Sequence, residues 1–332
     1  MSQPPGAVYR PTSLEICAGA GGQALGLERA GFKHVGLVEI EPVACETLRT
    51  NRPRWNVIQD DLWNFLQHQA ALFEGVDLVA GGVPCPPFSV AGKQLGADDE
   101  RDLFPAAIRL VEICKPLAVM LENVRGILDP RFDGYREQVL ARLSELGFSG
   151  EWKLLHASDF GVPQLRPRAV LVALRHELWR TFDWPSRKRR APSVGVALYP
   201  LMASRGWAGA SEWKKKANKI APTLVGGSRK HGGPDLGPTR ARRAWKELAV
   251  NGLVLAAEPP SPDFDGLPSL TVQMAARLQG FPPSWRIAGR KTAAYRQVGN
   301  AFPPPVAHAI GRQIADVLMR ASTRPELSEL TA

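Results

Sequence analysis

A short apolar segment, a glycine-rich turn and a helical pattern follow one another near the start of the chain, and they constrain its fold most strongly. Residues 13–18 (SLEICA) have the pattern of a buried strand, and the turn Gly19-Ala20-Gly21-Gly22 comes directly after them. Apolar residues then recur at helical spacing. Such a turn lets the backbone approach a ligand closely and directs amide N–H groups toward negative charge. The segment therefore predicts a βα unit that can bind a ligand at its turn.

Strand and helix patterns continue to alternate through the first half of the chain. Further strands are expected at 34–40, 56–58, 76–80, 117–121 and 169–174, and further helices at 42–49, 103–114 and 135–146. This alternation is typical of an α/β fold with a parallel, doubly wound sheet.

The segment from 183 to 268 breaks the pattern, because it is rich in Pro, Gly and basic residues and has few regular runs. Helices are expected again at 271–278 and 304–318. A chain of 332 residues is long enough for two domains. We therefore expect a large domain of residues 1–182 plus 269–332, and a second, smaller, loop-rich domain of residues 183–268.

The net charge of +10 is concentrated in the second half of the chain. Residues 1–150 have a balance of −5, whereas residues 151–300 have a balance of +15. Three basic runs stand in this half near several tryptophans: RKRR at 187–190, KKK at 214–216 and RARR at 240–243. This half would attract a polyanion such as nucleic acid, and phosphate neutralisation would make the binding weaker in salt.

Membrane and metal-binding classes find no support in the sequence. No apolar stretch approaches the roughly 20 residues of a membrane span, and the N-terminus lacks the pattern of a secretory signal. The four cysteines are widely spaced, without a metal or redox pattern. We expect a cytoplasmic protein without a bound metal, in which Cys17, Cys45 and Cys114 are buried apolar residues.

Acidic residues follow the second and third expected strands. Glu39 and Glu41 end the second strand, where a carboxylate can accept the two hydroxyls of a ribose. Asp60 and Asp61 end the third strand, where a carboxylate can accept from the amino group of an adenine. Together with the glycine-rich turn, these residues predict an adenosine-containing ligand across the strand ends.

A cysteine and charged groups follow the later strands. Cys85 lies after Pro84 in a proline-rich turn, and its thiol becomes a nucleophile where the surroundings favour the thiolate. Glu122 follows the neighbouring strand and is expected near Cys85. Arg166 and Arg168 precede the strand at 169–174 and offer two guanidinium groups.

In order and spacing, these segments resemble the DNA (cytosine-5) methyltransferase family. The resemblance covers nearly the whole chain, apart from about 180–220 and about 228–266. The matching segments are SLEICAGAGGQALGLERAGF at 13–32, GGVPCPPFSVAGKQ at 81–94, ENVRG at 122–126, QLRPR at 164–168, PTLVGG at 222–227, LTVQMAARLQGFP at 270–282 and RQVGNAFPPPVAHAIG at 296–311. One departure is Glu15-Ile16-Cys17, where the family usually has Asp-Leu-Phe.

The resemblance implies a catalytic role for four residues. Cys85 attacks C6 of a cytosine flipped out of duplex DNA, and C5 then takes the methyl group of S-adenosylmethionine. Glu122 contacts N3 and the exocyclic amine of that cytosine, and Arg168 holds its O2. Arg166 supports the site or contacts a phosphate.

It also implies a Rossmann-like methyltransferase sheet, with residues 183–268 as the target-recognition domain. The cofactor is S-adenosylmethionine, without a metal, and its expected contacts are Ala18, Gly19, Gly21, Gly22, Glu39, Ile40, Asp61, Leu62, Pro84 and Asn300. Asp61 is chosen over Asp60 because an apolar residue follows it.

A site-specific enzyme of a bacterial restriction–modification system is therefore the leading hypothesis. It would act on duplex DNA as a monomer, and a cognate restriction endonuclease would act on the same site without a stable complex. A tRNA methyltransferase with the same fold is the first alternative, although the long basic insert favours duplex DNA. A nicotinamide-dependent oxidoreductase would leave Cys85, Glu122 and the arginine pair without a joint role. An inactive DNA-binding regulator is disfavoured because all the catalytic residue types are present.

Overall fold

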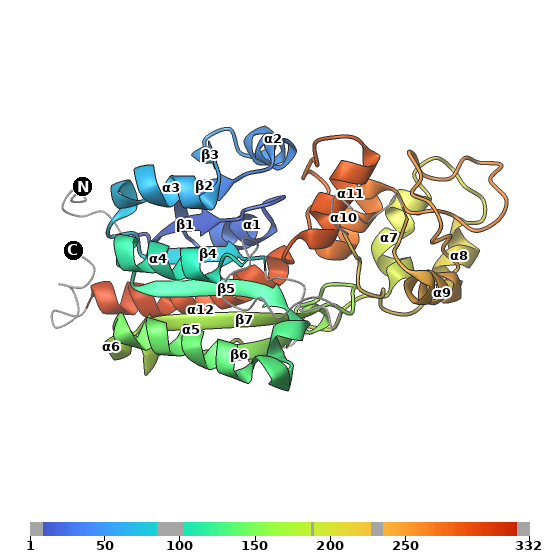
Figure 1. Cartoon of the computed structure of the whole chain (residues 1–332). Helices are drawn as coiled ribbons and strands as arrows, with labels where there is room; N and C mark the ends of the chain where they lie inside the picture. The colour runs from blue at the N-terminus through green and yellow to red at the C-terminus, as the bar shows by residue number, and fades with distance from the viewer. Residues whose placement is uncertain (1–8, 85–101, 187–188, 227–234, 324–332) are drawn as a thin grey trace.

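The structure is a computed structural model that describes residues 9–84, 102–186, 189–226 and 235–323 (Figure 1). Within these ranges the centre is a seven-stranded sheet of order β3-β2-β1-β4-β5-β7-β6. Its strands are β1 (Thr12–Ile16), β2 (Lys33–Glu39), β3 (Val57–Gln59), β4 (Leu78–Gly82), β5 (Ala118–Val124), β6 (Phe148–His156) and β7 (Pro167–Arg175). The predicted strands all form, and β6 is an addition.

Strands β1 to β5 run parallel, as predicted, but β7 pairs with both of its neighbours in antiparallel register. The prediction of a wholly parallel sheet is therefore wrong at this edge. The physical reason is the short connection from β6 to β7, because a parallel pair needs a crossover of a dozen or more residues.

Helices cover both faces of the sheet. On one face α1 (Gly22–Arg29) and α12 (Pro304–Ser322) share a core with β4, β5 and β7. On the other face lie α3 (Leu62–His68), α4 (Phe104–Cys114) and α5 (Asp133–Glu145). The remaining helical elements of this part are α2 (Pro42–Asn51), α6 (His176–Trp179) and the short 3₁₀ turns η1 (Ala70–Phe73), η2 (Arg125–Leu128), η3 (Pro130–Phe132) and η4 (Ala157–Asp159).

Five helices gather beside one end of the sheet, and we call residues 193–300 the helical lobe (Figure 1). They are α7 (Val194–Met202), α8 (Ala210–Lys216), α9 (Thr239–Glu247), α10 (Val272–Gln279) and α11 (Lys291–Asn300). Helices α7, α8 and α9 fall within 183–268 and were not predicted, although most described residues of this segment lie outside helices and strands. Sequence periodicity missed them because α8 is short and α7 contains Pro200.

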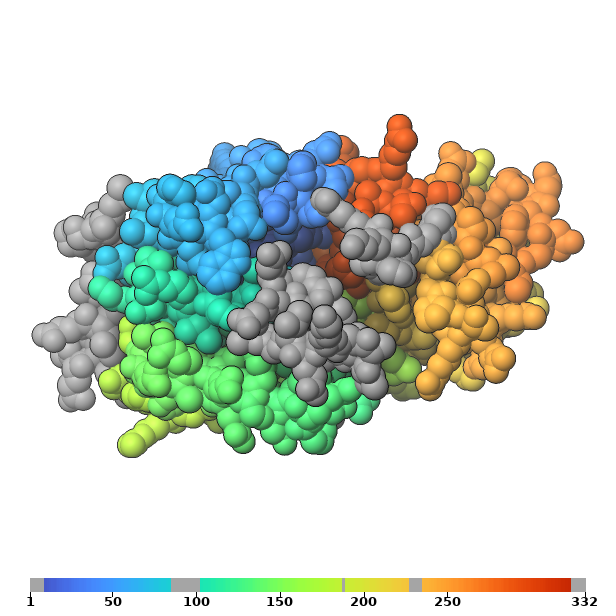
Figure 2. All heavy atoms as spheres, in the orientation of Figure 1, coloured from blue at the N-terminus to red at the C-terminus, as the bar shows by residue number. Residues whose placement is uncertain are grey.

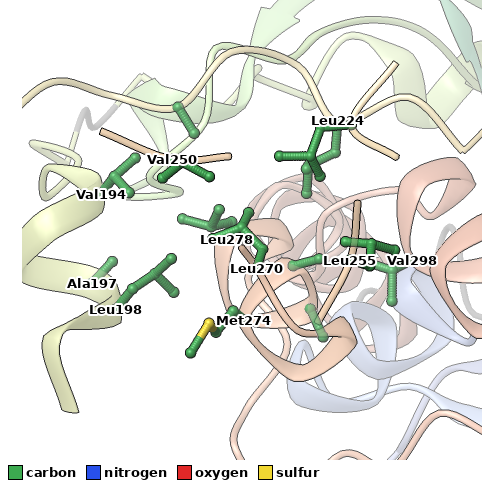
Figure 3. Packing of buried hydrophobic residues seen from close by; sticks show 14 of the residues in the cluster. Val194, Ala197, Leu198, Leu224, Val250, Leu255, Leu270, Met274, Leu278 and Val298 are labelled. Carbon is green, nitrogen blue, oxygen red and sulfur yellow. The ribbon is translucent and has the colours of Figure 1, made fainter. Parts of the chain in front are cut away.

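The core of the helical lobe joins α7 to α10 and α11, as Val194, Leu198, Met274 and Val298 show in Figure 3. This cluster also includes Leu25 of α1, and in Figure 2 the blue N-terminal part lies against the orange-red part of the lobe. The division of the chain at 182/183 and 268/269 stays a prediction.

Three of the tryptophans near the basic runs belong to this core. Trp207, Trp213 and Trp245 are at most 8% exposed, so they stabilise the lobe and do not form an aromatic surface. Cys45 and Cys114 are buried, as expected, whereas Cys17 is half-buried. In the part of the chain that the structure describes, no helix has both the length and the apolar character that a membrane span requires.

Candidate active site

A pocket of about 420 Å³ opens at the carboxyl ends of the central strands. Its walls come from the turn after β1, the ends of β2, β4 and β5, and the end of α11. Ligands of open α/β sheets bind at this edge, where the strand order reverses on either side of the first strand. The lining thus joins Gly19, Glu39, Glu122 and Asn300, which lie far apart in the sequence.

Strand register explains why these groups meet. Gly82 at the end of β4 pairs with Glu122 of β5, and the residue before Gly82 pairs with the last residue of β1. The last residue of β1 also pairs with the residue that precedes Glu39 in β2. Glu39, Cys17, Gly82 and Glu122 therefore form one row on one face of the sheet. A Cβ atom at Gly82 would lie 3.3 Å from Glu122 Oε2, so glycine leaves the carboxyl accessible.

The glycine-rich turn is held by Glu39 and by the far end of the chain. Glu39 Oε2 accepts the Gly19 N–H at 2.7 Å, and Oε1 accepts the Glu41 N–H at 2.7 Å. Gly22 approaches the carbonyl of Phe302 so closely that a Cβ atom there would lie 2.2 Å from its oxygen. Burial raises the pKa of Glu39, and the two N–H donors oppose that rise.

Glu122 and Arg168 form a buried ion pair. Arg168 Nε lies 2.6 Å from Glu122 Oε1, because the antiparallel register sets Arg168 opposite Val124, two residues beyond Glu122. Burial raises the pKa of Glu122, whereas the guanidinium groups of Arg168 and Arg166 lower it. A carboxyl group in this balance can carry a proton or release it to a ligand.

Cys85, the predicted nucleophile, lies outside the described residues. The described chain reaches Pro84, which is exposed, and resumes at residue 102. The backbone just before it is fixed by Asn123, whose Nδ2 donates to the Val83 carbonyl at 2.9 Å. The role of Cys85 stays a prediction.

Arg166 is fully buried and serves the backbone. Its guanidinium donates to the carbonyls of Leu224 at 2.9 Å, Gly299 at 2.6 Å and Ala301 at 3.1 Å. Of the two roles expected for it, this enclosure favours support of the site over contact with a phosphate. The two carbonyls that flank Asn300 are thereby held in place.

The predicted cofactor residues divide into two groups. Five of them line the pocket: Ala18, Gly19, Gly22, Glu39 and Asn300. Five others do not line it: Gly21, Ile40, Asp61, Leu62 and Pro84. Among these, Ile40 is 58% exposed and Leu62 is buried in the core under α3. Their contacts with a cofactor stay predictions.

The two aspartates after β3 differ in their surroundings. Asp60 accepts hydrogen bonds from the Asn64 side chain. Asp61 caps the start of α3 and is near enough to the pocket to act on Cys17, whose thiol pKa is raised by burial and further by nearby carboxylates that include Asp61. This difference favours Asp61 over Asp60 as the residue nearer to the pocket, although neither of them lines it.

Glu15 and Gln23 line the pocket as well, although sequence reasoning did not assign them a role. Glu15 is 1% exposed and Gln23 is 4% exposed, and Glu15 Oε2 and both amide atoms of Gln23 have no hydrogen-bond partner. The sequence signal that could have revealed Glu15 as a pocket residue is a carboxyl group inside the apolar segment 13–18.

Among the described residues, no group of three or more His, Cys, Asp or Glu could hold a metal ion.

Comparisons with known proteins cover almost the whole chain. A family model described as C-5 cytosine-specific DNA methylase matches residues 12–316. Type II methyltransferase M.NaeI of Lentzea aerocolonigenes is 58% identical over 313 residues, which are 92% of this chain and 75% of that protein. Type II methyltransferase M.NgoMIV of Neisseria gonorrhoeae is 55% identical over 314 residues, which are 93% of this chain and 98% of that protein.

Solved structures share the fold at lower identity. A mutant of Spodoptera frugiperda DNMT2 is 19% identical, with a TM-score of 0.64, over 92% of this chain and 99% of the other. The Entamoeba histolytica methyltransferase EhMeth is 14% identical, with a TM-score of 0.65, over 93% of this chain and 99% of the other.

Proposed function

Because the chain belongs to the C-5 cytosine-specific DNA methylase family, we propose that it is the modification enzyme of a type II restriction–modification system. It methylates C5 of one cytosine within a short DNA sequence and holds S-adenosylmethionine in the pocket at the strand ends. The observation that carries this proposal is the row of Glu39, Gly82 and Glu122, because one pocket joins a carboxylate suited to a ribose with a carboxyl group suited to a pyrimidine.

The pocket fits this cofactor in size and in polar groups. Its volume of about 420 Å³ lies within the range of about 300–1,000 Å³ typical of small-molecule sites. The Glu39 carboxylate accepts backbone N–H groups, those of Gly19 and Glu41 among them, and has further lone pairs for ribose hydroxyls. Asp61 is the acceptor for the adenine amino group, and Asn300 lines the pocket from the end of α11. When bound, S-adenosylmethionine supplies an electrophilic methyl group.

Cys85, Glu122 and Arg168 carry out the steps at the cytosine ring. The Cys85 thiolate bonds to C6 of the flipped cytosine, and the electron pair of the C5–C6 double bond moves to C5 for methylation. Glu122 shares its proton with N3 and offsets the charge that develops on the ring. Arg168 orients Glu122 and donates to O2. A water molecule then takes the C5 proton as a base, and the electron pair of the C5–H bond restores the C5–C6 double bond while the C6–S bond breaks and releases the Cys85 thiolate.

Duplex DNA is the substrate that the surface charge favours. On the helical lobe the lysines of α8 and Arg240, Arg243 and Lys246 of α9 are exposed. Such groups contact phosphates without reading sequence, so they position the duplex while base contacts select the site. The partner endonuclease and action as a monomer remain part of this proposal.

A methyl-transfer assay tests the chemistry. Purified protein with methyl-labelled S-adenosylmethionine and duplex DNA should place the label on cytosine C5, and bisulfite sequencing should locate it in one short sequence. Label on N4 of cytosine or on adenine would contradict the proposal. Faster transfer to tRNA than to duplex DNA would favour the RNA alternative.

Variants of two residues test the assigned roles. Cys85→Ser should abolish transfer, and Glu122→Gln should slow it by about 10²–10⁴-fold, the range of general acid–base contributions. Both variants should still bind S-adenosylhomocysteine in calorimetry, because neither residue is needed to hold the cofactor. Near-normal turnover of Cys85→Ser would refute the nucleophile.

A further inference from the structure

A second cavity, of about 300 Å³, shares none of its described lining residues with the cofactor pocket. Its walls are the last turns of α1 and α2 and residues 282–286 of the helical lobe. Three of its lining side chains are arginines, namely Arg29, Arg52 and Arg286. Helix α1 begins at the cofactor pocket, and a rise of about 1.5 Å per residue puts Arg29 about 10 Å along the helix from Gly22. The cavity is therefore a separate site, which we call the arginine cavity.

Trp285 and Arg52 give this cavity a fixed wall. Trp285 Nε1 donates to the Ala20 carbonyl at 3.0 Å, and the guanidinium carbon of Arg52 lies 5.2 Å from the centre of the Trp285 ring. Arg52 also forms a forked ion pair with Glu28, in which Nε lies 2.9 Å from Oε1 and Nη2 lies 2.8 Å from Oε2. The charge of Arg52 is therefore compensated by a carboxylate, and its position is fixed.

Arg286 is held across the cavity by its backbone, while its guanidinium group stays available. Asn51 Nδ2 at the end of α2 donates to the Arg286 carbonyl at 2.6 Å, and the Arg286 N–H donates to Asn51 Oδ1 at 2.8 Å. Arg286 and Arg29 are exposed, and neither guanidinium group forms a hydrogen bond or an ion pair with any residue that the structure describes. The two arginines thus bring uncompensated positive charge to a cavity with fixed walls.

Positive charge continues along α1 and α12 beyond the arginine cavity. Burial lowers the pKa of His308 on α12. The guanidinium groups of Arg29, Arg312 and Arg189 lower this pKa further, so they lie close enough to act on the same ring. Arg189 belongs to the basic run at 187–190, which the proposed function does not use. The arginine cavity therefore lies in a positive field that attracts polyanions.

We propose that the arginine cavity binds a phosphate group, and that a backbone phosphate of duplex DNA supplies it. Arg29 and Arg286 would bind the phosphate oxygens, with the hydroxyls of Thr50 and Ser284 as further donors. Such a contact reads no sequence, so it would hold DNA on the protein without selecting the site of methylation. The inference goes beyond the proposed function, because phosphate binding here can be measured whether or not the protein transfers methyl groups.

Two ligands test the proposal on the intact chain and distinguish the sources of the phosphate. Binding of inorganic phosphate is followed by phosphorus NMR line width, and binding of a duplex of A·T pairs, which offers no cytosine, by fluorescence anisotropy at several salt concentrations. Arg29→Gln with Arg286→Gln should weaken inorganic phosphate binding by at least about 10-fold, the equivalent of one lost hydrogen bond to a charged group. It should also reduce the salt slope of duplex binding by about 1, because the two arginines neutralise one phosphate.

A matched control removes the same charge elsewhere. Arg142→Gln on α5 with Arg180→Gln after α6 changes two exposed arginines that do not line the cavity, and it should leave phosphate binding and the salt slope unchanged. Ser284→Glu keeps both cavity arginines and puts a carboxylate beside them, so it should also lose phosphate binding; it serves if the double variant does not fold. All these variants should bind S-adenosylhomocysteine as wild type does, because none of the changed residues lines the cofactor pocket.

The outcomes separate the site, its ligand and the proposed function. No detectable binding of inorganic phosphate by wild type, or equal binding by wild type and the double variant, would overturn the site. Loss of inorganic phosphate binding with an unchanged salt slope would retain the phosphate site and overturn DNA as its source. If wild type bound phosphate but transferred no methyl group, the proposed function would fail and the arginine cavity would stand.

Discussion

Three carboxyl groups, those of Glu15, Glu39 and Glu122, are almost fully enclosed at one edge of the sheet. Burial raises the pKa of each above its ordinary value of 4.5. The native state therefore holds more protons than the unfolded state, and its stability falls as the pH rises from about 4.5 through the raised values. The three buried carboxyl groups therefore lower the free energy of unfolding at neutral pH, and a bound ligand that interacts with them would offset this loss.

Glu15→Gln isolates one of these carboxyl groups, since Glu39 and Glu122 remain. Without ligand, the variant should gain stability relative to wild type as the pH rises from 5 to 8, by up to about 1.4 kcal/mol per pH unit in which Glu15 titrates. Urea unfolding at several pH values measures this difference. A difference that does not depend on pH would show that Glu15 does not titrate in this range.

Arg166 stabilises three backbone carbonyls from within the core. Arg166→Met should lower the free energy of unfolding by about 2–5 kcal/mol, because those carbonyls lose their donor. It should also weaken S-adenosylhomocysteine binding, since Gly299 and Ala301 flank Asn300. Arg175→Met is the matched control, because Arg175 donates to the Pro116 and Leu146 carbonyls away from the pocket. Equal losses of affinity in both variants would assign the effect to general destabilisation.

At the scale of elements, sequence pattern predicted what is buried and periodic. Strands β1 to β5 and the helices α1, α4, α10 and α12 follow from continuous apolar runs and helical spacing. Strand β6 was not predicted because most of its residues are half-buried or exposed, so its sequence shows little contrast between apolar and polar positions. The same reasoning found Glu39 and Glu122 at strand ends, but not Gln23, because a polar residue in a first helical turn is usually exposed.

Helix α9 shows how a polar helix serves two surfaces. Trp245 anchors it in the core, while Arg240 and Arg243 are exposed. If both arginines contact phosphates, Arg240→Gln with Arg243→Gln should reduce the salt slope of DNA binding by about 2 and weaken binding to all sequences alike. Binding measured between about 50 and 200 mM salt tests this. Arg142→Gln on α5 is the control, and an unchanged slope in the double variant would place DNA elsewhere.

At the scale of the whole molecule, the core of the helical lobe extends to the turn after β1 and to α1. Leu25 of α1 packs in the same cluster as Trp213, Trp245 and Met274 of the lobe. Sequence composition registers the change at residue 183 but does not register contacts between distant segments, so the separate small domain stays a prediction. The long-range hydrogen bonds of Arg166 add to this connection.

This continuity predicts one cooperative unfolding transition. Tryptophan fluorescence, to which tryptophans of the lobe and of the rest of the chain both contribute, and far-ultraviolet circular dichroism, which reports on all helices, should give the same midpoint. S-adenosylhomocysteine at 100 times its dissociation constant should stabilise the whole chain by about 2.7 kcal/mol. Two separate midpoints, with only one that moves on ligand addition, would show that the lobe unfolds independently.

Because Gly22 packs against the carbonyl of Phe302, the pocket is complete only after residue 302 has been synthesised. A ribosome that adds about 5–20 residues per second needs about 15–60 s to reach residue 302, and until then the cofactor site lacks a wall. We therefore expect that chains shortened before Phe302 do not bind S-adenosylhomocysteine.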